Sequence, residues 1–108
     1  MTFEIRTLPE FDQQAKSLAK KYPSLKQDLQ HLVESLLQEP HQGIGLGKNC
    51  YKVRIRITSK GRGKSAGARV ITCIRVVEDV IWLLTIYDKS DRSTITDKEL
   101  SALVNKIQ

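Results

Sequence analysis

The spacing of apolar residues in the first half of the chain predicts two helices. A short strand is predicted at residues 3–7. After it, apolar residues recur every three or four positions, which is the period of an amphipathic helix. Pro23 ends the first helix, Ser24 is placed to cap the second, and Pro40 follows its end. The two apolar stripes are Leu8, Phe11, Ala15, Leu18 and Tyr22, and then Leu25, Leu29, Leu32, Leu36 and Leu37. The sequence therefore predicts a helical hairpin.

The second half of the chain has the patterns of β-strands. Residues 40–49 contain three glycines without an apolar period, which is typical of a loop. Residues 51–57 then alternate between polar and apolar side chains, and residues 69–77 are rich in Val and Ile. After a turn predicted at Glu78-Asp79, residues 80–87 are almost continuously apolar, as in a central strand that is buried on both faces. We therefore expect three consecutive strands.

A last helix is predicted where Thr96 and Glu99 have the spacing of a capping box. Its apolar side consists of Leu100, Leu103, Val104 and Ile107. The predicted order is β-α-α-β-β-β-α, which indicates an α+β fold with the helical hairpin on one face of a mainly antiparallel sheet. The other sheet face is expected to be free. The 108 residues suit one domain, which we expect to span residues 1–108.

Membrane association and disulfide bonding are not expected from this sequence. The chain has no apolar run near the ~20 residues that cross a bilayer, and its first residues lack the pattern of a signal peptide. We therefore expect a cytoplasmic protein. Cys50 and Cys73 lie far apart in the sequence, each in or beside a predicted strand, and do not form a Cys-x-x-Cys motif. Their positions indicate buried free thiols.

Positive charge is concentrated in the middle of the chain. Between Pro40 and Val77 there are nine Lys or Arg residues and no Asp or Glu, while the rest holds nine bases and twelve acids. Charges of +9 and −3 therefore add up to the +6 of the whole chain. In the strand predicted at 51–57, Lys52, Arg54 and Arg56 share one side, opposite the apolar residues. Such a line of cations favours binding to a nucleic-acid backbone, although a solvated strand face has the same pattern.

Further basic residues are suited to contact an RNA backbone. They are Lys48, Arg56, Lys60, Arg62 and Lys64. Residues 59–67, rich in Gly and cations, have the composition of a mobile hairpin loop that can adapt to RNA, and a loop that is only flexible and solvated is the alternative. Gly63-Lys64-Ser65 has the form of the end of a phosphate-binding loop. We exclude nucleotide hydrolysis, because Thr58 stands where that motif needs Gly and a strand follows instead of a helix.

The candidate chemistry depends on Lys, Arg and Tyr. His31 and His41 have no carboxylate or metal-ligand partner at a suitable spacing, and the acids fall in predicted turns or at a helix start. We therefore expect neither a metal nor a cofactor. The candidate catalytic residues are Lys52, Arg54, Arg69, Tyr87, Lys89 and Arg92. Such a set can cleave RNA without metal, because the 2′-OH attacks its own strand while Lys serves as base and Arg as fixed charge.

Three short motifs, in this order, resemble the RelE/ParE superfamily of toxins from bacterial toxin–antitoxin modules. They are Tyr51-Lys52-Val53-Arg54, Gly67-Ala68-Arg69-Val70-Ile71 and Ile86-Tyr87-Asp88-Lys89. The resemblance covers nearly the whole chain and is greatest to the HigB-like branch of RelE toxins, which cut messenger RNA on the ribosome. It implies a RelE-like fold, and a cognate antitoxin, the ribosome and mRNA as partners, with a possible larger complex of antitoxin and operator DNA.

The resemblance also implies roles for individual residues. Lys52 and Arg54 match the basic pair that contacts and activates the scissile site, and Arg69 matches the arginine that stabilises the phosphate. Lys89 and Arg92 fall in the basic segment where RelE has another catalytic arginine. Two alternatives stay open at this point. One is a ParE-like toxin that binds DNA gyrase, and the other is a basic RNA-binding module without catalysis.

The chain departs from the RelE pattern at an aromatic residue. RelE has a tyrosine near its C-terminus that stacks on the substrate, and residues 94–96 here contain none. Either Tyr87 replaces it or the role is missing. A two-residue turn at Glu78-Asp79 would pair Val70 with Tyr87 and place Arg69 on the opposite face, whereas a bulge or a longer turn would reunite them.

Overall fold

The computed structural model describes residues 2–60 and 67–107 and has the predicted α+β class. The elements are β1 (Glu4–Thr7), α1 (Pro9–Lys21), α2 (Leu25–Gln38), β2 (Ile44–Gly47), β3 (Cys50–Ile55), a 3₁₀ turn (Thr58–Lys60), β4 (Ala68–Arg75), β5 (Val80–Asp88) and α3 (Asp97–Val104). Strand β2 lies inside the segment that was predicted to be a loop, so the predicted order lacked one strand.

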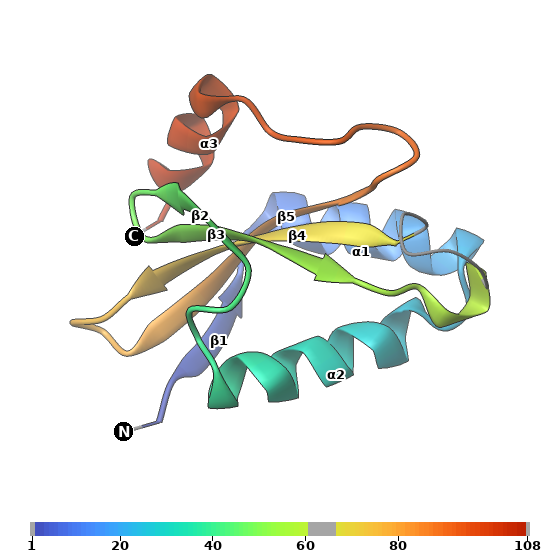
Figure 1. Ribbon diagram of the computed structural model, residues 1–108, viewed down its shortest axis with the longest axis horizontal. Coiled ribbons are helices and arrows are strands. Elements are labelled where there is room, and N and C mark those ends of the chain that lie inside the picture. Colours follow the sequence, from blue (N-terminus) through green and yellow to red (C-terminus); the bar gives the residue numbers. More distant parts are fainter. Residues whose placement is uncertain (1, 61–66, 108) are drawn as a thin grey trace.

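The strands form one sheet in the order β1-β5-β4-β3-β2. Among the described strands only β1 and β5 pair in parallel, which confirms the expectation of a mainly antiparallel sheet. Almost every residue of β5 is buried, in agreement with its continuous apolar pattern. Helices α1 and α2 pack on one face of the sheet, and α3 lies on the other (Figure 1). The second face is therefore partly covered, and the expectation that it is free was wrong.

The larger core lies between the helical hairpin and the sheet. Phe11 of α1 and Leu25 and Leu36 of α2 are buried against Val70 and Ile86 of the sheet. Ser24 precedes α2 as predicted, but its side chain makes no capping hydrogen bond. Its Oγ donates instead to the Asp28 carboxylate at 2.7 Å. The predicted cap is thus replaced by a contact within the first turn of the helix.

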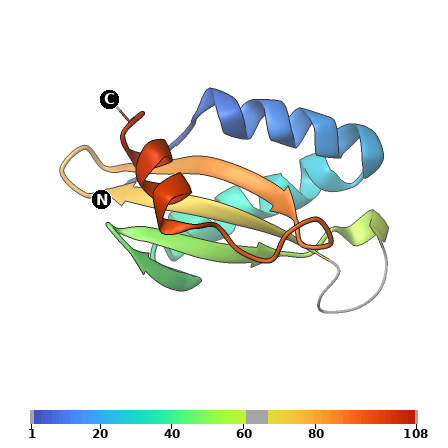
Figure 2. The same ribbon diagram turned by 90° about the horizontal axis from the view of Figure 1, so that it is seen from above.

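The smaller core lies beneath α3. Leu100 of α3 is buried with Leu84 and Tyr87 of β5 and with the side chains of Cys50 and Cys73. The predicted capping box at the start of this helix is confirmed by two reciprocal hydrogen bonds. From β5 the chain runs back over the same face of the sheet before it enters α3 (Figure 2).

The β4–β5 hairpin decides which side chains share a face of the sheet. Its turn spans residues 76–79 rather than Glu78-Asp79 alone, because Arg75 pairs with Val80. Thr72 pairs with Leu83, but the next residue of β4, Ile71, pairs with Thr85. Leu84 is therefore the extra residue of a bulge in β5. As a result Arg69 pairs with Tyr87. The sheet thus joins the two residues that an uninterrupted two-residue hairpin would separate.

The β2–β3 hairpin depends on two residues with left-handed backbone. Lys48 and Asn49 have φ angles of 57° and 61° and connect Gly47 with its partner Cys50. Positive φ at both central residues is the geometry of the tight turns whose twist matches that of antiparallel strands. Asn is common at such positions and Lys is not, so the sequence carried only a weak signal for this hairpin.

Candidate active site

The candidate site is built around a row of three residues across adjacent strands. Arg54 of β3 lies opposite Arg69 of β4, and Arg69 lies opposite Tyr87 of β5. Like charges placed directly opposite each other destabilise a sheet. Within the described residues neither arginine forms an ion pair. The row is therefore suited to receive an anion that neutralises both guanidinium groups.

A cleft of about 410 Å³ opens at the arginine end of this row. Four basic residues from three parts of the chain line it: Lys52, Arg54, Arg69 and Lys89. The described lining residues include no Asp or Glu, and Gly43, Ile44 and Ser93 complete the wall. A cleft of this size is within the range of sites that bind small molecules or single groups of a polymer. Its charge makes a phosphate the most suitable ligand.

Gly43 allows one wall of the cleft to approach β3 closely. Its φ angle is +100°, and a Cβ atom at this position would lie 2.5 Å from the carbonyl oxygen of Lys52. Only glycine combines this backbone conformation with so short an approach. The residue before β2 is thereby held against the strand that presents two of the four cations.

Arg69 is the most buried cation of the cleft. Its relative exposure is 5%, and Nη1 donates a hydrogen bond to the carbonyl oxygen of Ala68 at 3.1 Å. Burial, together with the nearby charge of Arg54, lowers the pKa of Arg69, although a guanidinium keeps its proton at neutral pH. The side chain is thus fixed in position and poorly hydrated, which strengthens its interaction with an anion.

A buried carboxylate next to the cleft fixes the end of β5. Asp88 accepts hydrogen bonds from Lys60 Nζ at 2.9 Å, from the Tyr22 hydroxyl at 2.7 Å and from the backbone and side chain of Ser90. Burial alone raises the pKa of Asp88, but the hydrogen bonds from Lys60, Ser90 and Tyr22 lower it below the usual range. This network connects the corner of the helical hairpin to the strand end from which Lys89 projects.

Lys60 therefore has a different place from the one predicted. It was expected to be a free cation of the RNA-binding loop, but it forms an ion pair with Asp88 and lies 5.4 Å from the centre of the Tyr22 ring. It does not line the cleft. Among the other predicted RNA contacts, Lys48 is in the β2–β3 turn and Arg56 is exposed beyond the end of β3. Arg62 and Lys64 lie outside the described residues.

Comparison with known proteins identifies the family of this chain. Residues 11–107 match the family described as the RelE toxin of the RelE/RelB toxin–antitoxin system. The chain belongs to the RelE toxin family. No curated protein is similar enough in sequence to count as a match. A solved structure of a mutant of the Escherichia coli toxin RelE in the free state aligns over 100% of both chains, with a TM-score of 0.66 and 14% sequence identity.

The structural similarity confirms the RelE-like fold that the sequence motifs implied. The match over most of the chain confirms a toxin of the RelE type. Neither comparison assigns the chain to the HigB-like branch, which stays a prediction. The residues of the site are likewise predictions for this RelE-family chain, because a similarity at 14% identity concerns the fold alone.

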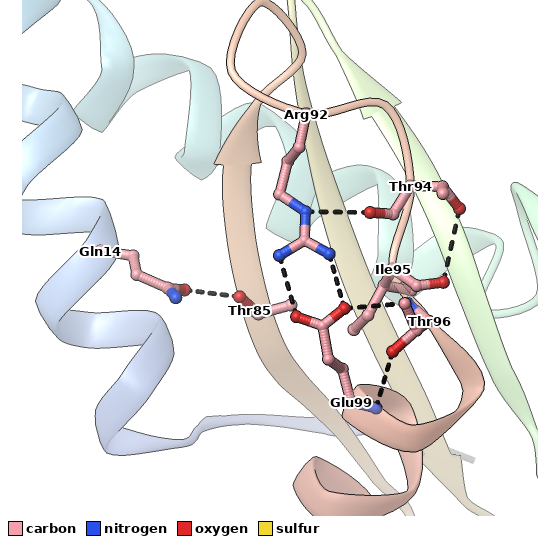
Figure 3. Close-up of polar contacts among 7 residues, drawn as sticks. All are labelled: Gln14, Thr85, Arg92, Thr94, Ile95, Thr96 and Glu99. Atoms are coloured by element: carbon pink, nitrogen blue, oxygen red, sulfur yellow. Dashed lines mark hydrogen bonds and ion pairs between the residues drawn. The ribbon is translucent and has the colours of Figure 1, made fainter.

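Arg92 and Tyr87 lie apart from the cationic cleft of this RelE-family chain. The guanidinium of Arg92 donates two hydrogen bonds to the Glu99 carboxylate, at 2.7 and 3.0 Å, and Nε donates to the carbonyl oxygen of Thr94 (Figure 3). It also lies 5.2 Å from the centre of the Tyr87 ring. The predicted catalytic arginine is thus tied to the first turn of α3.

Tyr87 is covered by α3 and by Arg92 of the segment before it. It is 9% exposed, its hydroxyl is buried without a hydrogen-bond partner among the described residues, and burial raises its pKa. With Arg92 it lines a separate hollow of about 510 Å³ whose walls include several carboxylates. At another wall Gln14 accepts hydrogen bonds from Thr85 Oγ1 and the Ile86 backbone, next to the bulge. The six candidates therefore divide into four that line the cleft and two, Tyr87 and Arg92, that line the separate hollow.

Sequence reasoning placed Asp88 among acids in turns, where carboxylates are solvated, and this was wrong. Asp88 is 1% exposed. Its position at the end of an apolar strand, between Tyr87 and Lys89, was the available signal, because a carboxylate in such a place requires partners.

Among the described residues no three His, Cys, Asp or Glu side chains gather as metal ligands would. The described helices are too short and too polar to cross a membrane.

Proposed function

We propose that this RelE-family toxin is a metal-independent endoribonuclease that cleaves messenger RNA on the ribosome and so stops translation. The observation that carries the proposal is the cleft formed by Lys52, Arg54, Arg69 and Lys89, in which four cations converge without a carboxylate among the described lining residues. Membership of the RelE toxin family supports the same function. The proposed place of action is the cytoplasm.

The proposed reaction needs three contributions from the cleft. The 2′-oxygen of the RNA attacks the adjacent phosphorus, the bond to the 5′-oxygen breaks, and a 2′,3′-cyclic phosphate forms. Arg69, fixed and buried beside Arg54, stabilises the charge that grows on the phosphate oxygens. Lys52 and Lys89 are the cleft residues that can exchange a proton, so we assign to them the 2′-OH and the leaving oxygen.

Arg92 and Tyr87 have a supporting role in this proposal. Arg92 is held by its ion pair with Glu99, and Tyr87 is buried in the small core with Leu100, so neither side chain points into the cleft in this structure. Their contacts hold α3 and the segment before it against the sheet. Lys48 and Arg56, which are exposed, are proposed to contact RNA or ribosomal RNA outside the reacting phosphate.

The proposed regulator is a cognate antitoxin. The description of the family, as the toxin of a toxin–antitoxin system, supports such a partner. An acidic segment that covers the cleft would neutralise the cations that RNA needs, and assembly of the complex on operator DNA is a further proposal. Copurification of the tagged chain with the product of its neighbouring reading frame tests the partnership.

The decisive experiment is controlled expression of the chain in growing cells, followed by primer extension on several messenger RNAs. New 5′ ends within reading frames are expected, and they should disappear with Arg69→Ala but not with Lys20→Ala, an exposed cation of α1. Intact RNA together with double-strand DNA breaks would favour a ParE-like action on gyrase. Translation arrest without any cleavage would favour a binding module without catalysis.

A further inference from the structure

The two cysteines, which are distant in sequence, lie directly opposite each other in the sheet. Cys50 of β3 pairs with Cys73 of β4. The backbone N–H of Ile74 donates a hydrogen bond to the carbonyl oxygen of Asn49 at 2.9 Å, which makes Asn49 and Ile74 a hydrogen-bonded pair. Hydrogen-bonded and non-hydrogen-bonded pairs alternate along antiparallel strands, so the adjacent pair, Cys50 and Cys73, is a non-hydrogen-bonded one. The Cα atoms of such a pair are about 4.5 Å apart, which lies within the range that a disulfide can bridge.

Both sulfur atoms point to the same place. Cys50 Sγ lies 3.5 Å and Cys73 Sγ 3.7 Å from the carbonyl oxygen of Lys48. Both thiols are free and buried. The interaction between the two neighbouring thiols lowers the pKa of Cys73 and raises the pKa of Cys50. One member of the pair is thus the better nucleophile and the other is placed to react with it.

The thiol pair lies on the same sheet face as the cationic cleft, at its covered end. Along β3, Cys50 precedes Lys52 and Arg54 on that face, and along β4, Cys73 follows Arg69. The pair belongs to the small core beneath α3, together with Leu100. The helix has eight residues, of which Leu100 is the buried one. Because so short a helix is anchored by a single buried residue, a local opening of α3 would expose this small core while the main core stays folded.

We propose that Cys50 and Cys73 are a redox site that forms a reversible intramolecular disulfide when hydrogen peroxide reaches them through an opening of α3. The Cys73 thiolate attacks peroxide, which breaks the O–O bond, releases hydroxide and leaves a sulfenic acid on Cys73. The Cys50 sulfur then attacks Cys73 Sγ, forms the S–S bond and releases water. The two thiols are oxidised and the peroxide is reduced to water, and a small dithiol restores the reduced form.

The consequence is a covalent link between β3 and β4 at the covered end of the face that bears the proposed active site. The disulfide closes the stretch of chain from residue 50 to residue 73 into a covalent ring and so stabilises the fold. Disulfide formation between Cys50 and Cys73 is independent of RNA cleavage, because it requires only the two sulfur atoms and peroxide.

The test is treatment of the purified full chain with hydrogen peroxide, followed by intact mass spectrometry and peptide mapping without reduction. The expected product is a monomer that has lost two hydrogen atoms and contains a peptide link between Cys50 and Cys73. Cys50→Ser should instead accumulate a sulfenic acid at Cys73 that dimedone traps. Folded wild-type protein that keeps both thiols, or that yields only intermolecular disulfides or sulfinic acids, would overturn the proposal.

The role of α3 is tested with a matched pair of variants. Thr96→Ala removes the capping residue of α3 and should accelerate disulfide formation about fivefold, the factor that corresponds to a typical cap. Leu36→Val trims a buried residue of the other core and should leave the rate unchanged. Equal acceleration in both variants would mean that the thiols react only from the globally unfolded state, which contradicts an opening of α3.

Discussion

Arg54 and Arg69 face each other across β3 and β4 as a non-hydrogen-bonded pair, the arrangement that brings opposite side chains closest. The repulsion between them is a cost that the folded chain bears while the cleft is empty. A phosphate between the two guanidinium groups removes this cost and forms charge-assisted hydrogen bonds with both. The sheet register thus prepares the cleft for an anion before any ligand arrives.

Removing one charge of this pair should stabilise the free protein. We expect Arg54→Gln to raise the free energy of unfolding by about 0.5 kcal/mol at low salt, the size of a cross-strand charge interaction. The gain should shrink in high salt because exposed charges are screened. Urea denaturation at two salt concentrations measures the effect. Arg56→Gln, the next exposed arginine of the segment, serves as control and should show little change.

Replacement of Arg69 by lysine separates catalysis from binding. Arg69→Lys keeps a positive charge and loses the planar fork of two donors. If Arg69 stabilises the transition state, cleavage should slow by on the order of 10²-fold, about 2.7 kcal/mol, while ribosome affinity stays close to that of the wild type. Single-turnover cleavage and ribosome binding are the two measurements. Equal and small effects of Arg69→Lys and of Arg56→Lys would remove Arg69 from the proposed mechanism.

The buried carboxylate of Asp88 should make stability depend on acidic pH. Its pKa is lowered in the folded state, so it contributes stability that is present above the unfolded pKa of about 3.9 and is lost as the pH falls further. We expect Asp88→Asn to destabilise the fold by about 3 kcal/mol at pH 7, because Lys60 loses its partner. The difference between variant and wild type should shrink below pH 4.

Denaturation midpoints measured between neutral and acidic pH test this expectation. Asp91→Asn is the matched control, because Asp91 is exposed and lies three residues along the chain. Asp28, whose pKa is also lowered, contributes to the acid response of both proteins, so only the difference between them reports on Asp88. A difference that stays constant across the pH range would contradict the assigned ion pair.

The four cations of the cleft should make RNA binding depend on salt. If all four neutralise phosphates of single-stranded RNA, the logarithm of the binding constant should fall with the logarithm of salt concentration with a slope of about −3. Lys89→Gln should reduce the magnitude of the slope by about 0.7. A fluorescent RNA that cannot be cleaved, titrated at several salt concentrations, provides the values. Binding that hardly varies with salt would exclude a phosphate-binding cleft.

The sequence was sufficient for the features that depend on a regular period. The helical stripes, the alternation of residues 51–57 and the capping box at Thr96 each arise from local spacing, and the structure contains all three. The cluster of Lys52, Arg54 and Arg69 followed from strand alternation and from family motifs. These residues meet because neighbouring antiparallel strands place them in register.

Other features depend on contacts that no local pattern reports. The bulge at Leu84, which brings Tyr87 opposite Arg69, is set by the turn and by packing on both faces of β5. Strand β2 depends on left-handed backbone at Lys48, where the residue type gave no hint. The ion pair between Lys60 and Asp88 joins residues that are 28 positions apart. Charge alone made Lys60 resemble its neighbours in the basic segment.

Gly43 tests whether the wall of the cleft positions Lys52. A Cβ atom would lie 2.5 Å from the Lys52 carbonyl oxygen, and a φ angle of +100° is strained for any other residue. We expect Gly43→Ala to cost about 1–3 kcal/mol of stability and to displace the start of β2 from β3. Cleavage should weaken beyond the loss of folded protein, because the backbone that carries Lys52 shifts.

The matched control is Gly45→Ala in the same strand. A Cβ atom at Gly45 would lie 3.8 Å from the nearest atom of the Tyr51 ring, which is an ordinary contact. Its backbone has no positive φ, so this variant should keep both stability and cleavage near those of the wild type. Thermal denaturation and single-turnover cleavage, measured where both variants are fully folded, compare the two. If Gly43→Ala then cleaves as fast as Gly45→Ala, the close approach supports the fold and not the position of Lys52.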